Sequence, residues 1–451
     1  MARETATTRW PKIVQNMIDD VEATFEQSDI PEQIEEGRRI QATLRIMKSE
    51  IMQDKPLQCV TFQTLATFLE MADVDPMSLS PLSSDGRPDI QSYNAQLAAF
   101  GKITWQNCPW LFAECYLYRC VQTLFARSRF WRNYDIFARQ KLSAFLASHA
   151  AVEELSERYV SLADAGAFAK TDDEAQRLIF CEMTEIALWG NATDLSLLSS
   201  LSLDQIQSLQ GKEAIHEGQA RIVSNDMPEA WDYLRSRRGG RVDIVLDNAG
   251  FELFTDLVYA LYLLDSDLAS SIKLHVKSMP WFVSDVMPHD MDVLLSALAD
   301  TTLFPGARHR SVRALTERLS DCYKTGLVSI AEHPFWTTGF DFQAMPAMAP
   351  ELHKDLLGSS LVIFKGDLNY RKLVRDANWP HTLPFKEAIG PLRGEKDGEG
   401  LKILALRTNK ADVCVGLSPD TLERVEDEAP GKAWVRNGKY AVISFSDGDY
   451  L

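Results

Sequence analysis

The stretch Val242-Asp243-Ile244-Val245-Leu246-Asp247-Asn248 decides the fold class of this chain. It is a short apolar run that stops abruptly on polar residues, and four other stretches repeat the arrangement: 221–226, 272–277, 361–367 and 401–410. Short continuous apolar runs are typical of strands buried on both faces, as in parallel sheets. From about Ile206 onward such runs alternate with helical patterns. The sequence therefore predicts an α/β fold with a mainly parallel sheet.

The rest of the chain divides by pattern. Residues 1–204 are predicted to form a mainly helical domain and 205–451 the α/β domain, with a covering insertion or lid near 300–352. Helices are expected at 31–53 and 61–71, among others; in the first, Ile40, Leu44, Met47 and Ile51 recur at helical spacing and predict one buried stripe. Residues 434–443, with Asn437-Gly438, predict a β-hairpin.

Composition limits the classes of partner. The chain has 451 residues, with 64 acidic and 47 basic side chains and a net charge of −17, which argues against nucleic acid or an anionic membrane as the main partner. Its seven cysteines are dispersed without a Cys-x-x-Cys pair, which favours free thiols in a reducing compartment. We expect a cytoplasmic protein that could also enter the nucleus, and the sequence identifies no protein partner.

Three oxygen-bearing side chains predict a metal site. In an open α/β sheet, ligands bind beyond the carboxyl ends of the strands, where the polar residues ending the apolar runs should converge. Asp247 and Asn248 end one predicted strand, and Asp285 follows the next. Carboxylate and amide oxygens suit a hard divalent cation. Each residue alone is better explained as a helix cap, but the three together favour a metal site.

Further polar residues are candidates for substrate binding. Glu252, one turn into the following helix, could face a ligand or simply suit the helix dipole. Lys365-Gly366-Asp367-Leu368-Asn369-Tyr370-Arg371 could bind a phosphate or sugar, or be a glycine turn with an Asp cap. Arg407 and Lys410 place two cations after the last of the five runs, where phosphate would suit them, unless this is an ordinary surface turn. Asn191 is explained equally well by a helix end.

Several long motifs resemble those of the damage-control phosphatase family, in the branch also described as acidic-residue (protein-glutamate) methyltransferases. They are Leu246-Asp247-Asn248-Ala249-Gly250-Phe251-Glu252, Lys277-Ser278-Met279-Pro280-Trp281-Phe282-Val283-Ser284-Asp285, Lys365-Gly366-Asp367-Leu368-Asn369-Tyr370-Arg371 and Arg407-Thr408-Asn409-Lys410, the last matching an Arg-Thr-x-Lys motif. Trp189-Gly190-Asn191 and Trp10-Pro11-Lys12-Ile13-Val14 are also similar, so the resemblance spans nearly the whole chain.

The resemblance implies a helical N-terminal domain on a three-layer α/β/α domain with a Rossmann-like sheet. It implies hydrolysis of phosphate monoesters of sugar phosphates, such as fructose 1-phosphate, with manganese, cobalt, nickel or magnesium. Asp247, Asn248 and Asp285 would hold the metal, and either a metal-bound water or one of the catalytic candidates Asp247 and Asp285 would attack phosphorus. The substrate would be held by Glu252, by Asp367, Leu368, Asn369, Tyr370 and Arg371, and by Lys410. Asn191 and Arg407 would support these residues from behind.

Two alternatives stay open at this stage. One is an S-adenosylmethionine-dependent methyltransferase acting on protein glutamates, although no glycine-rich nucleotide loop follows a predicted strand. The other is a non-catalytic protein whose acidic crevice binds a ligand or partner.

Overall fold

A computed structural model describes residues 4–57, 87, 89–170, 172–190, 220–396 and 398–449. They fall into two compact units: a helical unit of Met1–Gln140, Lys277–Asp285 and Pro334–Phe340, and a sheet unit of Lys141–Val276, Val286–His333 and Asp341–Leu451. The predicted domain boundary at 204/205 and the predicted helix 61–71 lie outside the described residues. None of the helices in the described ranges is both long enough and apolar enough to cross a bilayer.

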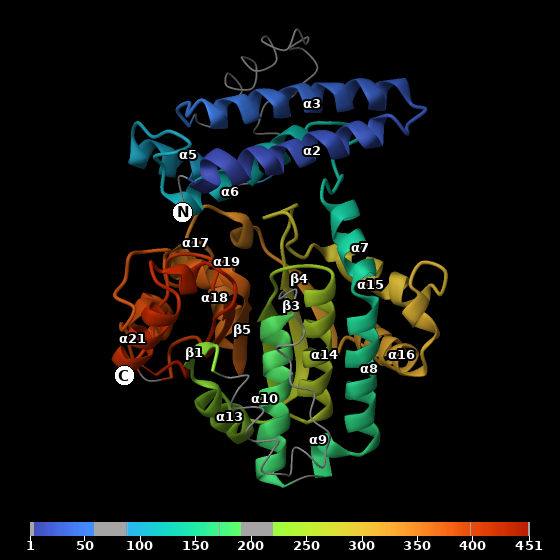
Figure 1. The fold of residues 1–451 in the computed structure, drawn as a ribbon, viewed down its shortest axis with the longest axis vertical. Helices are drawn as coiled ribbons and strands as arrows, with labels where there is room; N and C mark the ends of the chain where they lie inside the picture. Colours follow the sequence, from blue (N-terminus) through green and yellow to red (C-terminus); the bar gives the residue numbers. More distant parts are fainter. Residues whose placement is uncertain are drawn as a thin grey trace. The chain divides into compact units, whose positions relative to one another are not determined.

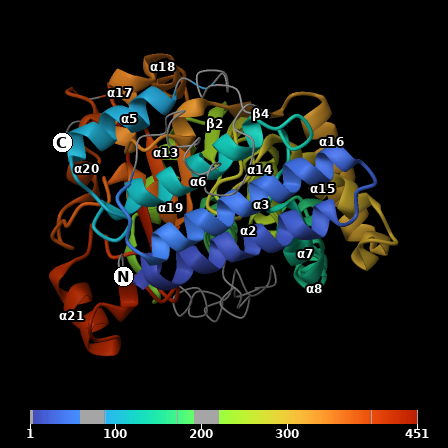
Figure 2. The same cartoon turned by 90° about the horizontal axis from the view of Figure 1, so that it is seen from above.

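The helical unit is built on four long helices, α2 (Trp10–Phe25), α3 (Pro31–Met52), α5 (Asp89–Phe100) and α6 (Trp110–Ala126). Helices α2 and α3 lie side by side (Figure 2). The predicted stripe on α3 is confirmed, because Ile40, Leu44, Met47 and Ile51 are all buried. Helix α7 (Ala138–Ala147) begins in this unit and continues into the next.

The sheet unit contains a seven-stranded sheet in the order β1-β7-β6-β5-β2-β3-β4. Among these strands, Figure 1 labels β1, β3, β4 and β5. The strands are β1 (Ile222–Asn225), β2 (Gly240–Val245), β3 (Ala269–Val276), β4 (Val328–Glu332), β5 (Leu361–Lys365), β6 (Ile403–Thr408) and β7 (Ala441–Ser446). Strands β2 to β6 are parallel, whereas β7 is antiparallel to β6. The prediction of a mainly parallel sheet is confirmed.

Alternate side chains of the strands point to opposite faces of the sheet, and each face packs against a layer of helices. On β2 and just after it, Val242, Ile244 and Leu246 join one large apolar core. The helices of that core are α8 (His149–Asp164), α9 (Ala167–Lys170), α10 (Asp173–Trp189), α13 (Met227–Ser236), α14 (Phe251–Asp265), α15 (Pro288–Ala299) and α16 (Arg310–Lys324).

The second layer covers the opposite face of the sheet. There Asp355 of α18 (Pro350–Leu357) pairs with Arg241 of β2 and Lys273 of β3. The other helices that follow β4 in the chain are α17 (Met345–Met348), α19 (Gly366–Leu373), α20 (Phe385–Ala388) and α21 (Pro419–Glu428). The three-layer arrangement is therefore confirmed.

Three details differ from the sequence predictions. Strand β1 pairs in parallel with β7, so it runs opposite to β2–β6 and its end at Asp226 cannot share their edge of the sheet. Residues 434–443 form no hairpin: β7 pairs with β6 and β1, while Trp434 and Val435 are buried in a short 3-10 helix. Strand β4, within 300–352, was missed because an edge strand is short and half-exposed.

The strand order places a topological switch point between β2 and β5. From β2 the chain adds β3 and β4 on one side, then returns to place β5 and β6 on the other. The connections that leave β2 and β5 therefore diverge to opposite sides. In open α/β sheets this is where a ligand crevice forms, beyond the carboxyl ends of the two strands.

Candidate functional site

Asp247 lies at this switch point, just past the end of β2, and is nearly buried. The backbone of Gly366, which begins α19 after β5, approaches it closely. A Cβ at position 366 would lie 2.0 Å from Oδ2 of Asp247, and the residue has φ +82°. Both the close approach and the left-handed backbone require glycine. The end of β5 is thus shaped around the Asp247 carboxylate.

Asn248 links Asp247 to the start of the next helix. Its side-chain amide donates to Oδ2 of Asp247 and to Oε2 of Glu252, each at 2.7 Å. Glu252 lies in the first turn of α14, where a negative charge suits the helix dipole. The structure therefore brings together three side chains that the sequence singled out.

Lys365 completes this cluster from the last position of β5. Its ammonium lies 2.7 Å from Oδ1 of Asp256 and 3.3 Å from Oε1 of Glu252, and it donates to the carbonyl of Ala187. All of these side chains are buried. Burial alone would lower the pKa of Lys365, but the two carboxylates outweigh it and raise that pKa above its usual value.

This pairing was not predicted from the sequence, in which Lys365 stood out only as part of a stretch that could bind phosphate and Asp256 was not singled out. The available signal was the spacing of Glu252 and Asp256, four residues apart and so on one face of α14.

Among the described residues and contacts, the cluster has more acidic than basic side chains. Asp247, Glu252 and Asp256 supply three carboxyl groups, and Lys365 supplies one ammonium. An excess of buried negative charge is unfavourable unless a cation neutralises it. Oxygen donors from a carboxylate and an adjacent amide also suit a hard divalent ion. The residues present therefore fit a divalent metal.

Asp256 gives the cluster a dependence on pH. Burial, reinforced by nearby Glu252 and opposed by Lys365, raises the pKa of Asp256 from 3.8 to about 7. Because this pKa lies above that of the unfolded chain, the unfolded state releases the proton first as pH rises. The stability linked to Asp256 is therefore complete below about pH 3.8 and lost as pH rises towards about 7.

Asp256→Asn removes this titration. Across that window, the free energy of unfolding of the variant is expected to rise relative to wild type, by at most about 1.4 kcal/mol per pH unit. Urea denaturation of both proteins at several pH values measures the difference. Parallel pH profiles would show that Asp256 ionises in the folded protein as it does in the unfolded one.

A second group of predicted residues lies past the ends of β5 and β6. Arg407 donates through Nε and Nη2 to Oδ1 of Asp367, at 2.8 and 2.7 Å, and the backbone N–H of Lys410 donates to the same oxygen at 3.1 Å. Burial would raise the pKa of Asp367, but Arg407 and Arg371 outweigh it and lower that pKa. In the described parts of the chain, no carboxylate pairs with the Lys410 ammonium. Asp367 and Arg407 thus fix the backbone that carries a half-buried, unpaired cation.

The remaining residues of α19 make structural contacts. Arg371 pairs with Asp376. The guanidinium carbon of Arg407 lies over the ring of Tyr370, 4.4 Å from the ring centroid. The amide of Asn369 donates to the carbonyls of Val245, Leu246 and Lys365, which ties the ends of β2 and β5 together. Leu368 is buried. Substrate binding by these residues stays a prediction.

Asp285 belongs to the helical unit, in the segment that follows β3. Its Oδ2 lies 3.2 Å from the ammonium of Lys277, and both side chains are buried. Its backbone N–H donates to the carbonyl of Trp281. Asn191 lies outside the described residues.

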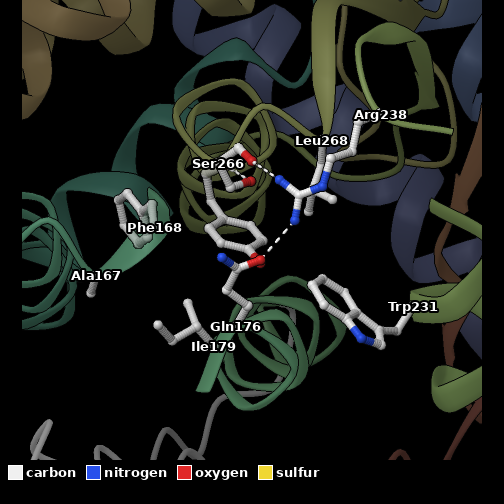
Figure 3. Close-up of a pocket in the computed structure, with 9 residues that line it drawn as sticks. Ala167, Phe168, Gln176, Ile179, Trp231, Arg238, Ser266 and Leu268 are labelled. Atoms are coloured by element: carbon white, nitrogen blue, oxygen red, sulfur yellow. Dashed lines mark hydrogen bonds between the residues drawn. The ribbon is translucent and has the colours of Figure 1, made fainter. Parts of the chain in front are cut away.

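A separate hollow in the sheet unit is lined mainly by apolar and aromatic side chains, including Phe168, Trp231 and Tyr262 (Figure 3). Its one guanidinium, Arg238, donates to the side-chain carbonyl of Gln176 and the backbone carbonyl of Ser266. Because no carboxylate lines it, the hollow offers no alternative metal site.

Comparison with known proteins identifies the family. Residues 5–425 match the family model described as the damage-control phosphatase ARMT1-like domain. Relatives named damage-control phosphatase ARMT1 are 33% identical in Danio rerio, 32% in Xenopus laevis and 29% in Homo sapiens; each alignment covers 98% of this chain and 94%, 95% and 95% of the relative. A crystal structure of a DUF89 family protein from Pyrococcus horikoshii has a TM-score of 0.36 and 14% identity, covering 82% of this chain and 95% of that one. The family match and the relatives agree over nearly the full length, so this chain belongs to the ARMT1-like damage-control phosphatase family.

Proposed function

We propose that this protein is a metal-dependent phosphatase that hydrolyses phosphate monoesters of sugar phosphates, fructose 1-phosphate among them, as part of metabolite damage control. Family membership supports the phosphatase role in metabolite repair. The observation that carries the metal dependence is the buried excess of carboxylates around Asp247, closed on one side by Gly366. The protein would act in the cytoplasm, with the nucleus as a second compartment.

Asp247, Asn248 and Asp285 are the proposed ligands of a manganese, cobalt, nickel or magnesium ion. Asp285 is included among the ligands because it is covalently joined to Val286. The backbone N–H of Val286 donates to the carbonyl of Asp247 at 2.9 Å. When bound, the ion would offset negative charge on the phosphate and polarise its ester bond. The excess negative charge of Asp247, Glu252 and Asp256 would favour its binding.

The chain's own side chains would position the substrate. The Lys410 ammonium would bind phosphate oxygens, because its backbone is fixed by Asp367 while its charge is unpaired in the described structure. Glu252, fixed by Asn248 and Lys365, would accept hydrogen bonds from sugar hydroxyls. Asp367, Asn369 and Arg371 would support this second part of the site through the contacts described above.

Phosphate release from a panel of sugar phosphates, measured with added manganese and then with excess chelator, tests the proposal. We expect release that chelator lowers by at least about 100-fold, since a metal that stabilises the transition state contributes several kcal/mol. Restoring manganese should recover it. If no metal supports release, while a labelled methyl donor transfers its methyl group to protein glutamates, the methyltransferase alternative replaces this proposal.

A further inference from the structure

The turn that carries Asp285 has an uncommon backbone. Phe282 and Val283 both have positive φ, +44° and +75°, although neither is glycine. A β-branched residue in this region is a clear outlier, and each such residue is energetically unfavourable. The N–H of Asp285 closes the turn on the carbonyl of Trp281 at 3.1 Å. Such a conformation persists only where its surroundings impose it.

Aromatic rings of the helical unit hold this turn. Tyr118 of α6 stacks on Phe282, with ring centroids 5.0 Å apart and an interplanar angle of 25°, and packs tilted against Trp281 at 5.8 Å. Tyr118 and Trp281 are buried, while Phe282 is half-buried. We call these three rings the aromatic clamp. Offset-stacked and tilted pairs of this kind stabilise a fold beyond the burial of their surface, so the clamp opposes the cost of the strained turn.

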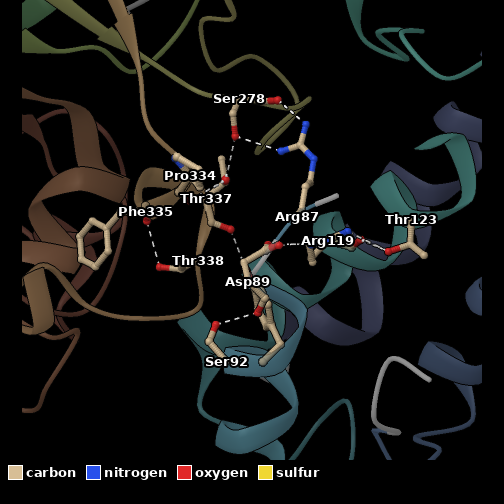
Figure 4. A network of polar contacts seen from close by, with 11 residues as sticks. Arg87, Asp89, Ser92, Arg119, Thr123, Ser278, Pro334, Phe335, Thr337 and Thr338 are labelled. Atoms are coloured by element: carbon tan, nitrogen blue, oxygen red, sulfur yellow. Dashed lines mark hydrogen bonds and ion pairs between the residues drawn. The ribbon is translucent and has the colours of Figure 1, made fainter. Parts of the chain in front are cut away.

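The start of the same segment is fixed separately. Arg87 donates to the hydroxyl of Ser278 at 3.1 Å and to its carbonyl at 2.8 Å, and the hydroxyl lies 3.2 Å from that of Thr337 (Figure 4). Nearby, the buried pair Arg119–Asp89 secures the first turn of α5 to α6. The segment is therefore held at Ser278 by polar contacts and at Phe282 by the clamp. The clamp contacts the strained residue Phe282 directly.

We propose that Tyr118 is a positioning residue that, through the aromatic clamp, holds the left-handed Phe282–Val283 turn and so fixes the Asp285 carboxylate for cation binding. This inference rests on the proposed function, in which Asp285 is a metal ligand. A ligand fixed before binding loses no conformational freedom when the ion arrives. Without the stacked ring, Val283 relaxes out of the left-handed region, and the turn that carries Asp285 changes with it.

Titration calorimetry of the full-length, metal-free protein with Mn²⁺ alone tests the proposal. Tyr118→Leu is expected to weaken Mn²⁺ binding about 10–100-fold, the usual effect of losing a group that orients a metal ligand. The matched control Tyr118→Phe keeps the ring and should bind as tightly as wild type. Far-ultraviolet circular dichroism checks folding; if Tyr118→Leu does not fold, Phe282→Leu removes the partner ring from a half-buried position and should show the same loss.

A second substitution separates positioning from general loss of structure. Glycine adopts positive φ without penalty, so Val283→Gly added to Tyr118→Leu should restore part of the lost affinity. Failure to restore any would contradict the role of the strained turn. Asp285→Asn separates a failure of the proposed metal ligand set from a failure of the positioning role of Tyr118. If it binds Mn²⁺ like wild type, the proposed ligand set is wrong; if it loses binding while Tyr118→Leu does not, only the positioning role is wrong.

Discussion

Gly366→Ala is expected to lower phosphatase activity by about 100-fold, as a displacement of about 1 Å at a reacting centre can do. The new Cβ would lie 2.0 Å from Oδ2 of Asp247 and 2.2 Å from its carboxyl carbon, distances that side chains do not tolerate. Either the carboxylate or the start of α19 must move. Because Asp247 is a proposed ligand, Mn²⁺ affinity should fall together with activity. Calorimetry and phosphate release measure the two effects.

Gly239→Ala is the matched control for that substitution. Gly239 has nearly the same backbone conformation, φ +79°, but a Cβ there would meet no atom within 4 Å. Each alanine should therefore cost about 1–2 kcal/mol of stability through the left-handed backbone, while only Gly366→Ala should lower activity. Equal activity in the two variants would show that the closeness of Gly366 to Asp247 has no functional importance.

Asp247→Asn is expected to lower phosphatase activity by at least about 10³-fold, because it removes a charged ligand from an ion that contributes several kcal/mol to the reaction. Without metal, the same variant should be at least as stable as wild type, since it removes a buried negative charge from a cluster that also holds the carboxylates of Glu252 and Asp256. Phosphate release with manganese and thermal unfolding in chelator measure these opposite effects.

Asp243, on strand β2 just before Asp247, is an aspartate for comparison. It is fully buried but paired with Arg241 and His275, each at 2.7 Å, and with Ser359. Asp243→Asn should therefore destabilise the fold by about 3–5 kcal/mol, the usual effect of breaking a buried pair, without changing Mn²⁺ affinity. If Asp247→Asn behaved like Asp243→Asn, losing stability but not metal, Asp247 would be a structural residue.

Local parts of the site could be predicted from the sequence. Asp247 and Asn248 are adjacent, and Glu252 is one helical turn further, so neighbouring positions and a single helix bring them together. The parallel strands were equally predictable, because β2, β5 and β6 are continuous apolar runs. What these features share is that each depends on contacts within a few residues.

The parts that were not predicted depend on partners distant in the sequence. The pairing of Lys365 with Asp256 joins two elements separated by more than a hundred residues. The direction of β1 is set by β7, at the far end of the chain. Asn437-Gly438 is a turn of the kind found in hairpins, but the strand after it pairs with β6. Local propensity favours a turn, and tertiary pairing decides what the turn connects.

The helical unit is assembled from three separate pieces of chain, Met1–Gln140, Lys277–Asp285 and Pro334–Phe340. During synthesis on the ribosome, its long helices emerge first, but the unit lacks its last piece until residue 340 of 451 has been made. In larger proteins the N-terminal domain commonly folds before the rest of the chain has been made. In this chain the helical unit cannot complete its fold in that order. A fragment ending at Gln140 would leave Tyr93 without the Thr337 carbonyl and Tyr118 without Trp281 and Phe282, so this chain cannot be dissected by simple truncation there.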